Sequence, residues 1–123
     1  MKRERSTGAI ALAASQMDNG LLTSSVILDL RLQAELVVLS ACNTGIDMIT
    51  GDGVMGLSRS LITAGATSVV VSLWSVPDEP TSLLMMEFYR QMQANPDKAQ
   101  ALRQALLTVA RKYPGPGNWA AFT

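Results

Sequence analysis

Two short runs of aliphatic residues constrain the fold of this chain more than any other feature. The first covers residues 36–39 and the second residues 69–71, and in neither do apolar and polar side chains alternate. Such strands are typical of a parallel sheet covered on both faces. Between them, apolar residues recur at helical spacing from Val54 to Leu61, and Gly65 then stops the helix. These elements predict a strand–helix–strand unit with parallel strands and a binding site at their carboxyl ends.

Two amphipathic helices are predicted in the second half of the chain. The first begins after Pro77 and Pro80, with Thr81 as its N-cap. The second runs from about Asp97 to Lys112. Its expected buried face consists of Ala99, Leu102, Leu106 and Val109. Together with the strand–helix–strand unit, these helices indicate the α/β class, with a mainly parallel sheet flanked by helices.

Three shorter segments complete the predicted fold. Residues 9–13 are expected to form a short buried strand. Residues 21–32 form either a helix of one or two turns or a loop, because Thr23 can cap a helix whereas the serines that follow it compete for the backbone. Residues 118–122 are expected to pair or pack at the end of the chain.

Charge and cysteine content exclude several classes of function. Lys and Arg together number 10 and so do Asp and Glu, which leaves a formal net charge of zero and no basic stripe to neutralise phosphates. We therefore expect no nucleic-acid partner. A single cysteine can form neither an internal disulfide nor a paired-cysteine zinc site, which favours a reducing, cytoplasmic setting. We expect no metal and no cofactor.

The N-terminus imitates a secretory signal, because MKRER is followed by GAIALAAS. Only Ile10 and Leu12 are strongly apolar in that stretch, so we expect it not to act as a signal. No run approaches the roughly 20 apolar residues that a membrane span requires. The sequence therefore predicts a protein without membrane association.

Cys42 lies where chemistry is expected, two or three residues beyond the end of the first predicted strand. The residues Asn43, Thr44 and Gly45 follow it and let the backbone turn and expose amides. A thiolate nucleophile needs a partner that lowers its pKa and backbone donors that hold the oxyanion. Position alone nevertheless favours the other role of a lone cysteine, that of a buried and inert apolar group.

Five motifs follow one another along the chain: LVVLSACNTG, GDGVMGL, the AGA before the second strand, SLWSVPDEPT and NWAAF. In this order they resemble the C-terminal half of the CHAT domain, a caspase-like module found beside tetratricopeptide repeats and related to separase. The resemblance extends from about Asp18 to the end of the chain. It implies part of a caspase-like, doubly wound sheet in residues 18–123, preceded by a short N-terminal segment, residues 1–17, with room for one strand.

The resemblance also implies a Cys-His dyad peptidase that cleaves a peptide or protein substrate after a basic residue. Cys42 falls on the nucleophile. Asp78 falls on an aspartate that receives the basic side chain, which a carboxylate can pair bidentately; it could equally be a turn residue or a helix cap. Trp74 is expected to form a wall of that pocket or to anchor the core, and Ser72 is assigned to the substrate site.

The chain departs from the family in one respect, because it contains no histidine. The resemblance places the dyad histidine in an H-G pair upstream of Asp18, and no remaining residue supplies a base that titrates near neutrality. We therefore expect the chain alone to be inactive as a peptidase and to be a truncated piece of a longer protein. Missing strands would leave apolar sheet edges uncovered, so we also expect self-association.

Two alternative functions stay open. One is a non-catalytic interaction module, in which the sheet edge and Met85, Met86 and Met92 dock a partner such as a repeat domain. The other is nucleotide binding, because residues 51–56 spell G-x-G-x-x-G. About ten residues separate this motif from the preceding strand and no acid follows at the distance needed to hold a ribose, so a structural role in helix packing is favoured.

Overall fold

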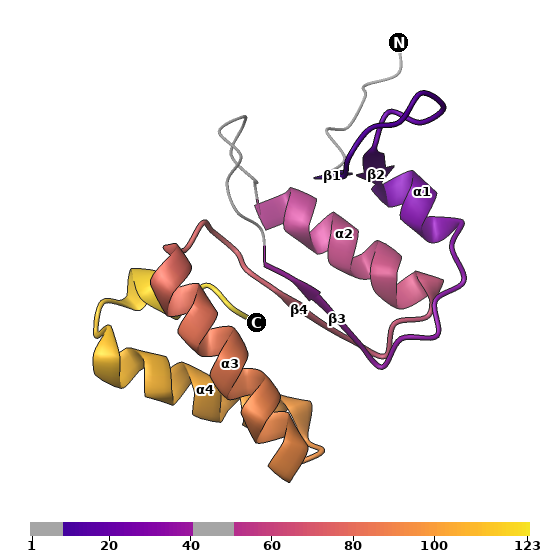
Figure 1. The fold of residues 1–123 in the computed structure, drawn as a ribbon. Helices are drawn as coiled ribbons and strands as arrows, with labels where there is room; N and C mark the ends of the chain where they lie inside the picture. Colours follow the sequence, from indigo (N-terminus) through magenta and orange to yellow (C-terminus); the bar gives the residue numbers. More distant parts are fainter. Residues whose placement is uncertain (1–8, 41–50) are drawn as a thin grey trace.

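The computed structural model of the chain describes residues 9–40 and 51–123. Along the chain its elements are β1 (Ala9–Ala11), β2 (Leu21–Thr23), α1 (Ser24–Leu28), β3 (Leu36–Leu39), α2 (Gly51–Ala64), β4 (Ser68–Val71), α3 (Asp78–Ala94), α4 (Lys98–Lys112) and a 3-10 turn at Pro116–Asn118 (Figure 1).

The two aliphatic runs form β3 and β4, which lie side by side and parallel. The last residues of the chain line the other edge of β4. Val71 and Thr123 exchange backbone hydrogen bonds of 2.9 and 3.0 Å, and Phe122 forms an antiparallel bridge with Ser72. β4 is therefore an interior strand. This arrangement confirms the α/β class, the parallel strand pair and the expected pairing of the C-terminal residues.

Helices cover both faces of this sheet (Figure 1). α3 and α4 lie on one face and α1 and α2 on the other, and each pair buries its own set of apolar side chains. The C-terminal core consists of Val70, Val76, Leu84, Phe88, Ala101, Ala105, Val109, Ala121 and Phe122. The N-terminal core consists of Ile27, Leu57, Leu61, Ala64 and Ala66.

β3 contributes to both cores, because successive side chains of a strand point to opposite faces. Leu36 and Val38 pack against the C-terminal core, and Val37 and Leu39 pack against the N-terminal core. All four side chains stay only partly buried, whereas the last two residues of β4 are buried. The aliphatic run of β3 thus faces apolar side chains on both sides, as predicted, but β4 is its single strand partner among the described residues.

A glycine determines how α2 ends. Gly65 follows α2 with φ of +122°, a conformation that favours glycine, and a Cβ there would collide with the carbonyl oxygen of Leu32. The predicted end of this helix is therefore confirmed. A Cβ on Gly56 would lie 3.9 Å from Oγ of Ser24, an ordinary van der Waals distance, so α2 faces α1 at this residue without requiring a glycine there.

α3 begins at Asp78, three residues before the predicted N-cap. Pro77 occupies the N-cap position, and Thr81 lies in the first turn, where its Oγ1 and N–H donate to the Pro77 carbonyl at 3.0 and 3.2 Å. The prediction that Thr81 caps the helix was wrong, because Pro80 does not interrupt a first turn in which its missing N–H would have no partner. Asp78 and Glu79 favour that turn through the helix dipole.

α4 begins as predicted, with Asp97 as its N-cap. Its Oδ1 accepts hydrogen bonds from the N–H groups of Ala99 and Gln100 at 3.0 and 3.2 Å. The predicted buried face is correct only at Val109. The fully buried residues are Ala101, Ala105 and Val109, because small side chains line the surface where α4 packs against α3, while Ala99 is exposed and the two leucines are partly buried.

The N-terminal residues form a separate antiparallel pair of strands, β1 and β2. Oγ1 of Thr23 accepts a hydrogen bond from the N–H of Val26 at 3.3 Å and caps α1. The helical alternative for this segment is therefore confirmed over residues 24–28, and β2 before it was not predicted. β1 is shorter than the strand expected at residues 9–13, and Leu12 beyond it is 59% exposed.

Candidate functional site

The carboxyl ends of β3 and β4 lie next to each other, with Leu39 opposite Val71. The N–H of Ser72 continues the ladder by donating to the Leu39 carbonyl at 3.3 Å. Ser40 follows β3 and is exposed. Cys42 lies outside the described residues, so its position and its assignment as nucleophile stay a prediction.

Ser72 is held on both sides by backbone contacts, through its N–H to β3 and through its bridge to Phe122. Its side chain is buried, with the residue 4% exposed, and its Oγ has no hydrogen-bond partner among the described residues. A buried hydroxyl without a partner costs free energy that an apolar side chain would not. Among the buried side-chain atoms of the described residues, this oxygen has an unused capacity to donate and accept.

Trp74 is fixed against the C-terminal turn of the chain. Its Nε1 donates to the carbonyl oxygen of Gly117 at 3.1 Å, while the residue stays 43% exposed. Nearby in the chain, Nε1 of Trp119 donates to the Pro114 carbonyl at 3.5 Å. One polar atom of Trp74 is therefore satisfied, and much of its ring surface is available for a ligand.

Asp78 is the first residue of α3 and is exposed. Its neighbour Glu79 accepts a hydrogen bond from the Tyr113 hydroxyl at 3.2 Å. The helix-dipole role of Asp78 is compatible with its position, and so is a role in receiving a cationic side chain. Neither role is excluded by the geometry of the helix start.

The C-terminal segment, residues 113–123, touches each part of this region. Phe122 bridges Ser72, Gly117 holds Trp74, and Tyr113 holds the residue beside Asp78. The sequence pattern does not predict this scaffold. Residues 114–117, Pro-Gly-Pro-Gly, are typical of a helix stop, but a turn that is rich in glycine also offers carbonyl groups that side chains can approach closely.

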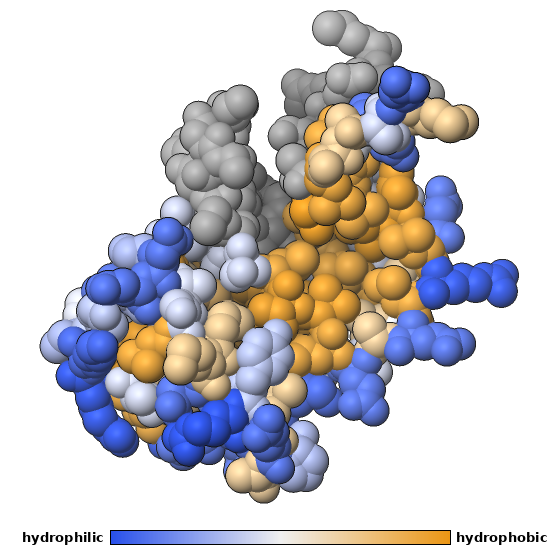
Figure 2. All heavy atoms as spheres, in the orientation of Figure 1, coloured by the Kyte–Doolittle hydropathy of each residue, from blue (hydrophilic) through white to orange (hydrophobic). Residues whose placement is uncertain are grey.

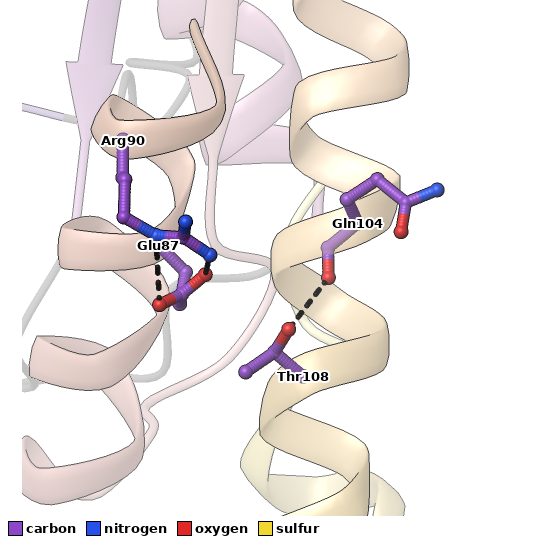
Figure 3. Close-up of polar contacts among 4 residues, drawn as sticks. All are labelled: Glu87, Arg90, Gln104 and Thr108. Atoms are coloured by element: carbon purple, nitrogen blue, oxygen red, sulfur yellow. Dashed lines mark hydrogen bonds and ion pairs between the residues drawn. The ribbon is translucent and has the colours of Figure 1, made fainter. Parts of the chain in front are cut away.

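The polar contacts drawn in Figure 3 each lie within one helix. Arg90 donates through Nε and one terminal nitrogen to both carboxylate oxygens of Glu87, at 3.2 and 2.7 Å, and Oγ1 of Thr108 donates to the Gln104 carbonyl at 3.1 Å (Figure 3). The hydrogen bonds from Arg90 lower the pKa of Glu87, and the carboxylate raises the pKa of Arg90 in turn. These pairs lie on the outer turns of α3 and α4 and are structural.

Among residues 9–40 and 51–123, no group of three or more His, Cys, Asp and Glu side chains is placed to hold a metal ion. Within the same residues, no helix is both long and apolar enough to cross a membrane.

Comparison with known proteins assigns the chain to a family. The sequence profile of the CHAT domain matches residues 2–123. The chain is 36% identical over 105 residues to tetratricopeptide repeat protein 28 of Mus musculus and 36% identical over 104 residues to that of Homo sapiens. These matches cover 84% and 83% of this chain but 4% of each relative. No solved structure matches. The chain belongs to the CHAT domain family.

Proposed function

We propose that residues 18–123 are the nucleophile-bearing C-terminal part of a caspase-like cysteine peptidase that cleaves after a basic residue. The observation that supports this best is the parallel register of β3 and β4. Because of it, the segment that leads to Cys42 and the segment that carries Ser72, Trp74 and Asp78 both leave the sheet at the carboxyl ends of the strands. In α/β sheets, ligands bind at these carboxyl ends.

The chemistry requires a thiolate and a base. In this proposal Sγ of Cys42 attacks the carbonyl carbon of the scissile peptide bond, and a base accepts the thiol proton. The chain has no histidine, so the base comes from polypeptide outside these 123 residues, and the chain alone binds substrate without turning it over. A thiol that must stay reduced fits a cytoplasmic setting.

The basic side chain is recognised by Trp74 and Asp78. An arginine guanidinium can stack on the exposed face of the indole and donate two parallel hydrogen bonds to the carboxylate. The hydrogen bond from Trp74 to Gly117 fixes the edge of the ring and leaves its face free for stacking. Ser72 belongs to the substrate site through the adjoining strand end, which its backbone contacts with Leu39 and Phe122 hold in place, while its Oγ is buried.

Covalent labelling tests this recognition without requiring turnover. Cys42 is the only cysteine of the chain, so intact mass spectrometry reports its alkylation directly. Two peptide chloromethyl ketones that differ only in a terminal arginine or glutamate residue are compared. We expect the arginine probe to label at least about tenfold faster, because a charge-assisted hydrogen bond contributes roughly 1.5–3 kcal/mol.

Asp78→Asn should abolish this preference, and the matched variant Glu79→Gln should retain it. Cys42→Ser should not be labelled, and iodoacetamide should alkylate the Asp78→Asn and parent proteins at the same rate. Equal labelling by the two probes in the parent protein would contradict the proposed specificity. An unchanged preference in Asp78→Asn would contradict the assignment of that residue.

The interaction-module alternative is supported by one observation on α3. Met86 is 68% exposed and Tyr89, one turn further, is also exposed, whereas Met85 and Met92 pack against the C-terminal core. The relatives are named for tetratricopeptide repeats, so a helical repeat domain is the partner to test. If Met86→Glu abolishes binding to an adjoining repeat domain while labelling of Cys42 is unchanged, the interaction role stands beside the peptidase role.

Nucleotide binding gains no support from the fold. β3 ends at Leu39 and α2 begins at Gly51, so the glycine motif does not follow its strand directly as a dinucleotide fingerprint does. Within α2, Gly56 faces Ser24 of α1.

A further inference from the structure

The loop between β4 and α3 is tied to the C-terminal segment, residues 113–123, in two different ways. Its first part is held by backbone contacts, because the N–H of Leu73 donates to the Ala121 carbonyl at 2.8 Å, directly after the bridge between Ser72 and Phe122. The part that leads into α3 makes no such backbone hydrogen bond to that segment among the described residues. In Figure 1 the start of α3 lies beside the turn that follows α4, and a side-chain contact joins the two.

That contact is a hydrogen bond between Tyr113 and Glu79. The Tyr113 hydroxyl donates to Oε2 of Glu79 at 3.2 Å, which links two residues 34 positions apart in the chain. The bond is exposed, and hydrophilic residues dominate over α3 and α4 on the face shown in Figure 2. Because water competes for an exposed hydrogen bond, this one can position Glu79 only if Tyr113 itself is held in place.

Three contacts hold Tyr113. Its N–H donates to the Val109 carbonyl at 2.7 Å at the end of α4, and its side chain packs against the C-terminal core. Nζ of Lys112 lies 5.5 Å from the centre of its ring. A tyrosine side chain rotates about only two χ angles, so packing of the ring also fixes where the hydroxyl lies. The hydroxyl is therefore a donor with a fixed position at the end of α4.

Glu79 passes this position on to Asp78, because the two are consecutive residues in the first turn of α3. In a helix with 3.6 residues per turn, consecutive side chains are separated by about 100° around the axis. Once Glu79 is directed toward Tyr113, the rotation of this turn is set, and so is the direction of Asp78. The turn benefits from such an anchor, because its N-cap residue, Pro77, makes no side-chain hydrogen bond to it.

We infer that Tyr113 is a positioning residue, which acts through Glu79 and fixes the direction in which Asp78 meets a basic side chain. This role rests on the proposed function, in which Asp78 receives that side chain. The C-terminal segment also holds Trp74, through the Gly117 carbonyl. The indole and the carboxylate then both take their positions from one segment, which keeps constant the spacing that stacking and a bidentate hydrogen bond require together.

The arginine chloromethyl ketone tests this role when its concentration is varied. The half-saturating concentration reports how well the probe is held before it reacts, and the maximal labelling rate reports the reactivity of Cys42. Tyr113→Phe removes the hydroxyl and keeps the ring. We expect it to raise the half-saturating concentration about threefold or more, because one hydrogen bond is lost. The maximal rate and alkylation by iodoacetamide should be unchanged, and circular dichroism verifies that the variant is folded.

Variants of Glu79 separate positioning from a general loss of stability. Glu79→Gln keeps an oxygen that can accept from the hydroxyl and should behave as the parent does. Glu79→Leu removes the acceptor and should raise the half-saturating concentration as much as Tyr113→Phe, and the double variant should show no further increase, because both changes remove the same bond. Thr108→Val, which removes a hydroxyl that donates within α4, is the matched control and should have no effect.

The outcomes distinguish this role from the function on which it rests. If the parent is labelled equally by the arginine and glutamate probes, the proposed recognition fails and the role of Tyr113 falls with it. If the parent prefers the arginine probe but Tyr113→Phe leaves its half-saturating concentration unchanged, the inference about Tyr113 alone is overturned. Additive effects of Tyr113→Phe and Glu79→Leu would overturn it too, since the hydroxyl would then act by another route. A lowered maximal rate in Tyr113→Phe would indicate a general disturbance of the site and would also overturn it.

Discussion

The apolar cores on the two faces of the sheet differ in how completely they are buried. On the α3–α4 face, the C-terminal core is sealed by the last residues of the chain, and Leu84, Phe88 and Val109 are fully buried. On the α1–α2 face, Ile27 is fully buried, but the other core residues, Leu57, Leu61, Ala64 and Ala66, are 4–8% exposed. The C-terminal core includes Ala121 and Phe122 from the end of the chain, so the difference teaches that a helix pair buries its core more completely when a further segment packs against it.

The largest expected effect compares equal deletions in the two cores. Leu84→Ala and Ile27→Ala each remove the same number of carbons from a side chain that is 0% exposed. We expect Leu84→Ala to lower the free energy of unfolding by about 4 kcal/mol and Ile27→Ala by about 2 kcal/mol, because partly exposed walls can collapse into the space that is left. Urea unfolding at one protein concentration measures both.

Leu84→Met and Ile27→Val serve as conservative controls and should each cost less than about 1.5 kcal/mol. Equal losses for the two alanine variants would contradict the difference between the cores. Such a result would mean that the walls around Ile27 are as rigid as those around Leu84.

A second prediction concerns backbone packing at the end of α2, on the α1–α2 face of the sheet. Gly65 has φ of +122°, and a Cβ would meet the Leu32 carbonyl, whereas a Cβ on Gly117 would have no atom within 4 Å. Gly65→Ala should destabilise the chain by roughly 2 kcal/mol or more, and Gly117→Ala should change stability by less than about 0.5 kcal/mol. Thermal unfolding distinguishes them. A harmless Gly65→Ala would mean that the junction of α2 and β4 shifts freely.

A third prediction compares two buried serines. Oγ of Ser60 donates to the Gly56 carbonyl at 3.0 Å, whereas Oγ of Ser72 has no described partner, and both residues are 4% exposed. Ser60→Ala should cost about 1 kcal/mol, and Ser72→Ala should be neutral or slightly stabilising. Chemical unfolding measures both. A loss of stability in Ser72→Ala as large as that in Ser60→Ala would show that the Ser72 hydroxyl already has a partner within the protein.

The elements predicted correctly from the sequence are those whose pattern is set by local physics. The aliphatic runs predicted two parallel strands, Gly65 predicted the end of α2, and Asp97 predicted the start of α4. The errors arise where tertiary contacts decide. Thr81 looked like a cap only because Pro80 was taken as a break, and the buried face of α4 was shifted toward its leucines because periodicity cannot show where small residues allow close helix packing.

For the candidate site, the sequence predicted which residues belong to the site better than it predicted which groups those residues contact. The motif around Trp74 was found, but the hydrogen bond from its indole to Gly117 spans 43 residues of the chain and leaves no local pattern. Ser72 was assigned to the substrate site by resemblance, and its buried, unpartnered Oγ could not be predicted from neighbours in sequence. The roles of Cys42, Ser72, Trp74 and Asp78 stay predictions, and the labelling experiment addresses those of Cys42 and Asp78.

The smallest expected effect concerns the surface pair on α3, which lies on the more closed side but outside its core. The hydrogen bonds from Arg90 hold the pKa of Glu87 below its ordinary value. A carboxylate with a lowered pKa contributes stability that is fully present above the ordinary glutamate pKa of about 4.3 and is lost as the pH falls through its lower folded value. Glu87→Gln should therefore destabilise slightly at pH 7 and have no effect in strong acid, and the effect at pH 7 should shrink with added salt because Arg90 is 66% exposed. A double-mutant cycle with Arg90→Gln provides the control, since without the guanidinium the pH dependence of Glu87→Gln should vanish. If that dependence persists, a group other than Arg90 stabilises the carboxylate, and the pair of Glu87 and Arg90 does not stabilise α3.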